Sequence, residues 1–123
     1  MNFKVCVVFF KLDPSQNIRL TFGVRDIEEK ISIPSVKLKD TLPSEAAKAI
    51  CNLFMDVDCD WLEKIEASFF ENEKDTILVY KVNVPYNVKL TGGLRWCGYE
   101  EVINNRNSFS EDDIKALTVC TGI

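Results

Sequence analysis

The sequence contains no histidine. Histidine is the usual acid or base near neutral pH and the commonest metal ligand in proteins. Its absence excludes a Ser-His-Asp or Cys-His mechanism outright. Any catalysis by this chain would have to rest on carboxylates, lysine, tyrosine or thiols.

The five cysteines form no C-x-x-C pair, which excludes a zinc ribbon and a thioredoxin-type redox site. They are Cys6, Cys51, Cys59, Cys97 and Cys120. An odd number of widely spaced cysteines is typical of buried or half-buried free thiols in a reducing compartment. We therefore expect a cytoplasmic, intracellular protein.

Long apolar runs and basic clusters are also missing. The apolar start is broken by Lys11 and by Asp13-Pro14, far short of the ~20 residues that a membrane span needs, and it has no small-residue cleavage site. We expect a central strand there, not a signal peptide. The formal net charge is −4, and Lys37 and Lys39 are only a local pair. Neither nucleic acid nor an acidic membrane surface is therefore expected as a partner.

The composition is that of one ordinary globular domain, so we expect a single domain over residues 1–123, with 46% hydrophobic and 28% charged residues. Apolar runs and alternating patterns predict strands at 4–12, 18–24, 31–33, 62–70, 76–84 and 94–96, with loops at 25–30 and 34–42. Helices are predicted at 43–55, at 99–104, and from the N-cap Ser110 to Gly122. This order predicts the α/β class, with a mixed β-sheet flanked by helices.

The segment from Ile33 to Ala47 resembles the entry to a Nudix box. That family's pattern is an apolar residue, Pro, two Gly, a charged loop, then Glu-Thr-Pro and a helix that opens with Glu-Ala-Ala. Pro34 and the helix start at 43–47 fall almost in register, with one residue missing in the loop. The stretch from Arg95 to Val102 is similar to the family's late W-x-x-x-E-E-L segment. The resemblance implies a Nudix-like α/β/α sandwich.

The carboxylates that make Nudix proteins hydrolases are missing. In the family, helix glutamates at i, i+3 and i+4 share one face and hold Mg²⁺ against a substrate diphosphate. Carried over in register, these positions are Ile50, Leu53 and Phe54, and residues 46–55 contain no Asp or Glu. We therefore expect no catalytic residues, no metal and no cofactor. The helix's apolar arc of about 160° exceeds the ~100° of a surface helix, which favours a packed or hydrophobic-contact surface at these three positions.

Weaker candidates for ligand contacts are spread along the chain. Arg19, Arg25 and Arg95 suit contacts to phosphate. Tyr86 and Trp96 suit stacking on a nucleotide base. Each of these residue types is more often a packing or surface residue, so the sequence does not join them into one site.

Three functions remain open. The first is a catalytically silent Nudix-like domain that acts as a protein-interaction or regulatory module, with a protein partner or a second copy in a homodimer. The second is a domain that recognises a nucleotide diphosphate without cleaving it. The third is a divergent Mg-dependent hydrolase that uses acids outside the box, such as Glu45, Asp56, Glu71 or Glu100. An exposed apolar patch on the box helix would favour the first function. A cleft that holds an arginine beside an aromatic ring would favour the second.

Overall fold

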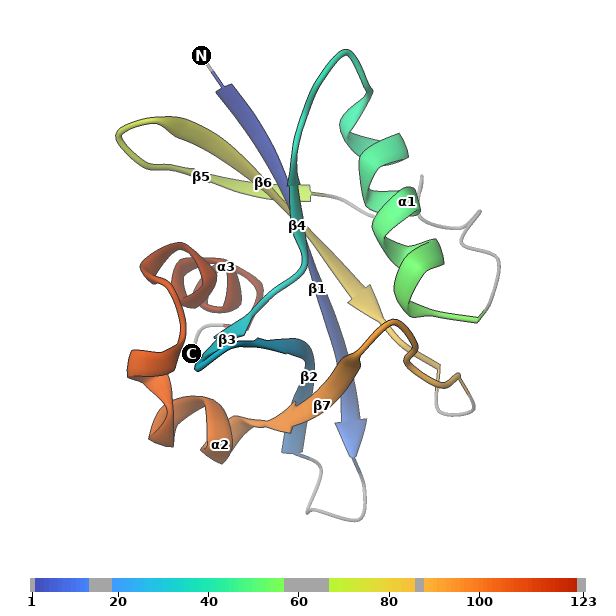
Figure 1. The fold of residues 1–123 in the computed structure, drawn as a ribbon, viewed down its shortest axis with the longest axis vertical. Helices are drawn as coiled ribbons and strands as arrows, with labels where there is room; N and C mark the ends of the chain where they lie inside the picture. The colour runs from blue at the N-terminus through green and yellow to red at the C-terminus, as the bar shows by residue number, and fades with distance from the viewer. Residues whose placement is uncertain (1, 14–18, 57–66, 86–87, 122–123) are drawn as a thin grey trace.

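The computed structural model describes residues 2–13, 19–56, 67–85 and 88–121, without the side chains at 12, 13, 19 and 121. In chain order, the elements are β1 (Asn2–Asp13), β2 (Arg19–Ile27), β3 (Lys30–Ser32), β4 (Ser35–Lys37), α1 (Pro43–Phe54), β5 (Ala67–Glu71), β6 (Asp75–Asn83), β7 (Leu94–Gly98), α2 (Tyr99–Asn104), the 3₁₀ helix η3 (Arg106–Ser108) and α3 (Glu111–Thr121). The described strands form one mixed sheet, with α1 on one face and α3 on the other (Figure 1). The predicted α/β class is confirmed.

β1 is the centre of the sheet, whose main path runs β3-β2-β1-β6-β5. It is parallel to β6 and antiparallel to β2 and β4. Val5, Val7 and Phe9 point into the core beneath α1, while Cys6 and Val8 point into the core beneath α3. A strand covered on both faces needs apolar residues at every position, which is why this segment is a continuous apolar run.

β1 and β2 pair at one end and then take different partners. They are in register from Phe10 to Asp13, but the other half of β1 pairs with β4. The far half of β2 pairs with β3 on one edge and β7 on the other. The chain passes from the edge of β2 to the edge of β1 at Pro34, whose carbonyl accepts a hydrogen bond from the Val7 N–H at 3.0 Å. β4, paired with β1, and β3, paired with β2, therefore lie on the two sides of the place where β1 and β2 separate, which we call the wedge.

Two segments differ from the sequence prediction. Residues 35–37 were expected in a loop, but they form β4 because β1 offers them a free edge. The loop expected at 25–30 is only the turn Glu28-Glu29, where Glu28 has a φ of 57°. Arg25 to Ile27 stay in β2 because β3 pairs with them there. In both places a tertiary pairing overrides a polar, weakly patterned sequence.

The predicted N-cap of α3 is confirmed. The Ser110 hydroxyl accepts the Asp113 N–H at 3.1 Å, as an N-cap should. The Asp113 carboxylate accepts the Ile33 N–H at 3.2 Å. This bond fastens α3 to the link between β3 and β4, and burial raises the pKa of Asp113 above its usual value.

Four of the five cysteines lie within the described residues, and all four are free. Cys6, Cys51 and Cys97 are buried and Cys120 is half-buried, as predicted, while Cys59 lies outside the described residues. Burial raises the pKa of Cys97 to about 12 and that of Cys120 to about 11. The cytoplasmic location inferred from these thiols stays a prediction. Among the described residues the longest helix has 12 residues, so no helix there could span a bilayer.

Candidate binding groove beside α1

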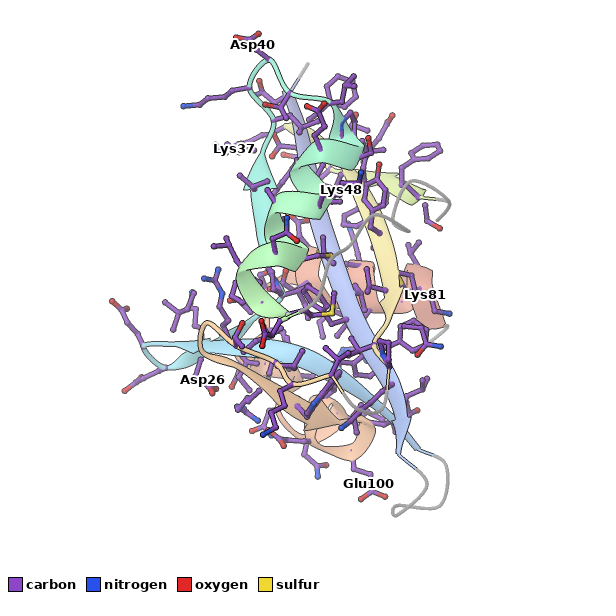
Figure 2. All side chains as sticks on the ribbon, turned by 90° about the vertical axis from the view of Figure 1, so that its right-hand side faces the viewer. Asp26, Lys37, Asp40, Lys48, Lys81 and Glu100 are labelled. Carbon is purple, nitrogen blue, oxygen red and sulfur yellow. The ribbon has the colours of Figure 1, made fainter. Side chains whose placement is uncertain are left out.

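A cavity of about 720 Å³ lies between β4, the loop that follows it and α1. We call it the groove; it is lined by Arg25, Pro34–Lys39, Thr41, Glu45, Ala46, Ala49, Ile50, Leu53 and Phe54. Its volume falls within the range of small-molecule sites, and it is open along one side. Figure 2 looks onto α1 and shows the wedge opening between Lys37 on β4 and Asp26 on β2.

The three box positions of α1 have different environments in this groove. Ile50 and Phe54 are 6% and 5% exposed and belong to the core beneath α1. Leu53 is 66% exposed, and across the groove Val36 on β4 is 42% exposed. The wide apolar arc of α1 is therefore mainly core packing, and the contact surface expected at all three positions reduces to Leu53 together with Val36.

Arg25 reaches the groove from β2. Its guanidinium carbon lies 5.2 Å from the centre of the Phe54 ring, within the range of a cation–π contact. Its Nε is buried without a hydrogen-bond partner among the described residues, and so is the hydroxyl of Ser32, its direct partner on β3. Buried polar groups normally have partners, so this pair is an exception within the described part of the chain.

The groove is locally basic although the chain is acidic. Its described lining residues include three cations, Arg25, Lys37 and Lys39, and one carboxylate, Glu45; the Lys37 side chain leaves β4 on the face opposite Val36. These four side chains sum to +2, whereas the whole chain carries −4. The groove therefore favours an anionic ligand over a cationic one.

The groove does not suit the magnesium ions that a Nudix box holds. A hard cation needs several oxygen ligands, and the α1 face here offers only Glu45 at its first turn. Within the described ranges no three acidic or cysteine side chains come together as a metal site would require. Apolar residues stand at Ile50, Leu53 and Phe54, where the family resemblance puts carboxylates, so no step through a metal can be built on these residues.

Arg95, another predicted phosphate contact, is already paired with two carboxylates. It donates two hydrogen bonds to Asp26 on β2, at 2.5 and 3.0 Å, and one to Glu101 on α2 at 2.7 Å. The hydrogen bond from Arg95 lowers the pKa of Asp26, and these two carboxylates raise the pKa of Arg95. Glu101 therefore serves an ion pair in this structure, although sequence reasoning could place a general base in its region.

Of the other predicted ligand residues, Trp96 is described and does not line the groove. Trp96 on β7 packs against the core beneath α1, and the Lys11 ammonium lies 4.4 Å from the centre of its ring. Arg19 begins β2, and its side chain is not described. Tyr86 lies outside the described residues. Of the five candidates, the structure places only Arg25 in the groove.

Sequence reasoning missed the contribution of β4. Val36, Lys37 and Lys39 line the groove, but the segment was expected to be a loop of mixed charge. A three-residue strand gives almost no periodic signal, because only one of its side chains faces the core side. The weak alternation of Val36 and Leu38 with Lys37 and Lys39 was the signal in the sequence that pointed to it.

No protein-family model matches this sequence, and no curated protein matches it. Solved structures do resemble the fold. A MutT/nudix family protein from Enterococcus faecalis matches with a TM-score of 0.62 and 11% identity, over 79% of this chain but only 43% of that one. The C-terminal domain of mouse MUTYH, solved in complex with human PCNA, matches with a TM-score of 0.68 and 16% identity, over 97% and 86% of the two chains.

A third structure covers both chains almost fully. It comes from work on MutT of Aliivibrio salmonicida and Vibrio cholerae and matches with a TM-score of 0.60 and 13% identity, over 99% of this chain and 98% of that one. Identities this low describe the fold and not the function. This chain therefore has the Nudix fold.

Proposed function

We propose that this chain is a non-hydrolytic binding module that recognises a protein partner through the groove. The observation that carries the proposal is the exposure of Leu53 and Val36, one on each side of an open, basic cavity. Exposed apolar side chains grouped around a cavity are typical of interaction sites. The fold is also found assembled with a protein, in the MUTYH domain bound to PCNA, although that partner belongs to that protein.

The missing carboxylates support the non-hydrolytic part of the proposal. Hydrolysis of a diphosphate on this fold depends on metal ions that activate water and offset the phosphate charge. Residues 46–55 supply no acid, and Glu45 alone cannot hold such a cluster. The acids named for a divergent hydrolase do not gather into a metal site among the described residues. Binding without turnover is the activity that these residues favour.

The interaction is tested with the variant Leu53→Asp, which places a charge on an exposed side chain and leaves the core intact. We expect the unmodified chain to retain a set of proteins from an extract of its source cells. Leu53→Asp should lose that set, and Lys74→Gln, which changes an exposed residue of the β5–β6 turn, should keep it. Equal retention by all three chains would contradict recognition through the groove.

Recognition of a nucleotide diphosphate is a second candidate function. Arg25 beside Phe54 is the arrangement that favours it, because the guanidinium suits a phosphate and the groove walls suit a base. Thermal melts with Mg²⁺ and ADP-ribose, NAD, dinucleoside polyphosphates or nucleoside triphosphates test it. A bound compound at 100 times its Kd should stabilise the chain by about 2.7 kcal/mol. Release of a hydrolysis product would contradict both candidate functions.

A further inference from the structure

β4 presents an open backbone edge to the groove. Its one partner among the described strands is β1. The Leu38 N–H donates to the Phe3 carbonyl at 2.9 Å, and the Val7 N–H donates to the Pro34 carbonyl at 3.0 Å. In an antiparallel pair this alternation makes Val36 the residue that bonds to β1. The N–H and C=O groups of Ser35 and Lys37 therefore point away from β1, toward the wedge.

An open strand beside a helix is the setting in which proteins bind extended peptides. The peptide adds as a further strand, its backbone bonds supply affinity, and alternate side chains enter the space beside the helix. Here α1 lies along the groove and offers Ala49 and Leu53. β4 has three residues, about 10 Å of strand, which suits a peptide segment of about three or four residues.

We propose that the groove's occupant is an extended, acidic segment of a partner protein, which adds as a strand to β4. This inference rests on the proposed interaction function and states the chemistry of the partner. The acidic side chains of the segment pair with the cations along the groove, and its apolar side chains pack between Val36 and Leu53.

The acidic character follows from the charges around the open edge. Among the described lining residues Arg25, Lys37 and Lys39 outnumber Glu45, so a carboxylate at that end can pair with the Arg25 guanidinium. Lys37 also disfavours a second copy of this chain as the occupant. Two β4 edges placed together would bring their lysines together, and edge lysines are a common device against such self-pairing.

The charge preference is tested with two pools of ten-residue peptides on the immobilised full chain. In one pool Glu alternates with randomised apolar residues, and in the other Lys replaces Glu. We expect the acidic pool to be retained about tenfold more strongly, the size of one charge-assisted hydrogen bond. Equal retention, or preference for the basic pool, would overturn the acidic partner.

Strand addition is tested by amide hydrogen exchange, with the best-retained acidic peptide as the probe. In the free chain the outward amides of Ser35 and Lys37 should exchange fast, and the Val36 amide, bonded to β1, should exchange slowly. Bound peptide should slow the two outward amides and leave Val36 unchanged. Binding that shifts Ala49 and Leu53 without protecting Ser35 and Lys37 would refute strand addition and leave the groove-binding function standing.

Two variants separate the backbone contact from the charge contact. Ser35→Pro removes only an outward N–H, so it should weaken peptide binding about tenfold while Val36 stays protected.

Arg25→Gln should weaken binding by a similar factor, and Lys74→Gln, which loses the same charge outside the groove, should change it less than about twofold. Normal binding by Ser35→Pro would overturn the proposal. If the amides of Ser35 and Lys37 become more protected as the protein concentration rises without peptide, the occupant of the groove is a second copy of this chain and not a partner protein.

Discussion

Arg25 and Arg95 lie on paired strands, one register position apart, and their environments are opposite. Arg25 is opposite Leu94, whose side chain belongs to the core beneath α1, while Arg95 is opposite Val24, which belongs to the core beneath α3. The two side chains therefore leave the sheet on opposite faces. Arg95 donates to Asp26 and Glu101, whereas Arg25 has a buried Nε without a partner and an aromatic ring beneath it.

The comparison shows that the same residue type is held by two acids on one face and lies beside an aromatic ring at a cavity on the other. Three of the five N–H donors of Arg95 already bond to two acids, so a phosphate or carboxylate would have to compete with Asp26 and Glu101. Arg25 has unused hydrogen-bonding capacity at the edge of a cavity. The availability of partners, and not the residue type, decides which arginine can hold a ligand.

The largest expected effect comes from the ring beneath Arg25. Phe54 is 5% exposed and meets Phe9 edge-on, with 6.2 Å between the ring centres. Phe54→Ala should lower the free energy of unfolding by about 3–5 kcal/mol, because it empties a core position. Leu53→Ala, one residue away and 66% exposed, should change it by less than about 0.5 kcal/mol. Urea unfolding at pH 7 measures both, and equal losses would show that Leu53 is part of the core.

The turn that holds the end of α1 offers a second matched pair. A Cβ on Gly92 would lie 2.9 Å from the Leu53 carbonyl and 3.0 Å from the Phe54 ring, at a φ of 65°. A Cβ on Gly93 would meet nothing within 4 Å, at a φ of 82°. Gly93→Ala should cost about 1 kcal/mol of backbone strain, and Gly92→Ala about 2–3 kcal/mol because the clash adds to the strain. If the two variants unfold at the same urea concentration, a Cβ on Gly92 makes no costly steric contact with α1.

The long elements of the fold could be read from the sequence. Val5 to Phe10 is apolar at every position, residues 80–84 alternate, and α1 begins at the proline that predicted it. These elements bury large apolar faces, so their patterns are strong. β4 was harder to read, because the weak alternation of Val36 and Leu38 with Lys37 and Lys39 is its only local signal and its pairing partner is β1.

The candidate site was less predictable than the fold. The absence of carboxylates from α1 was clear from residues 46–55 alone. The division of the box positions into buried Ile50 and Phe54 and exposed Leu53 depends on how closely α1 lies against β1 and β6. The sequence could not show which of three arginines would be free, because the partners of Arg95 come from Asp26 and Glu101, 69 and 6 residues away.

Replacing each arginine with methionine tests the comparison directly. Arg95→Met removes two exposed ion pairs and should lower the free energy of unfolding by about 1 kcal/mol, or roughly 4 °C in Tm. Arg25→Met keeps an apolar stem over Phe54 and removes a buried donor without a partner, so stability should stay within about 0.5 kcal/mol. Thermal melts at pH 7 measure both. A larger loss in Arg25→Met would mean that Arg25 is a structural residue like Arg95.

The smallest expected effect is a difference between Asp26 and Asp113 in how each contributes to stability as the pH changes. The hydrogen bond from Arg95 lowers the pKa of Asp26, so its contribution to stability is present above the unfolded value of about 3.9 and is lost as the pH falls through the folded value. Burial raises the pKa of Asp113, so its contribution is present below about 3.9 and is lost as the pH rises through the folded value.

Between pH 6 and pH 3, the Tm advantage of the unmodified chain over Asp26→Asn should shrink. Over the same range, the unmodified chain should gain relative to Asp113→Asn. Parallel trends in the two variants would show that the Arg95 ion pair does not stabilise the charged form of Asp26.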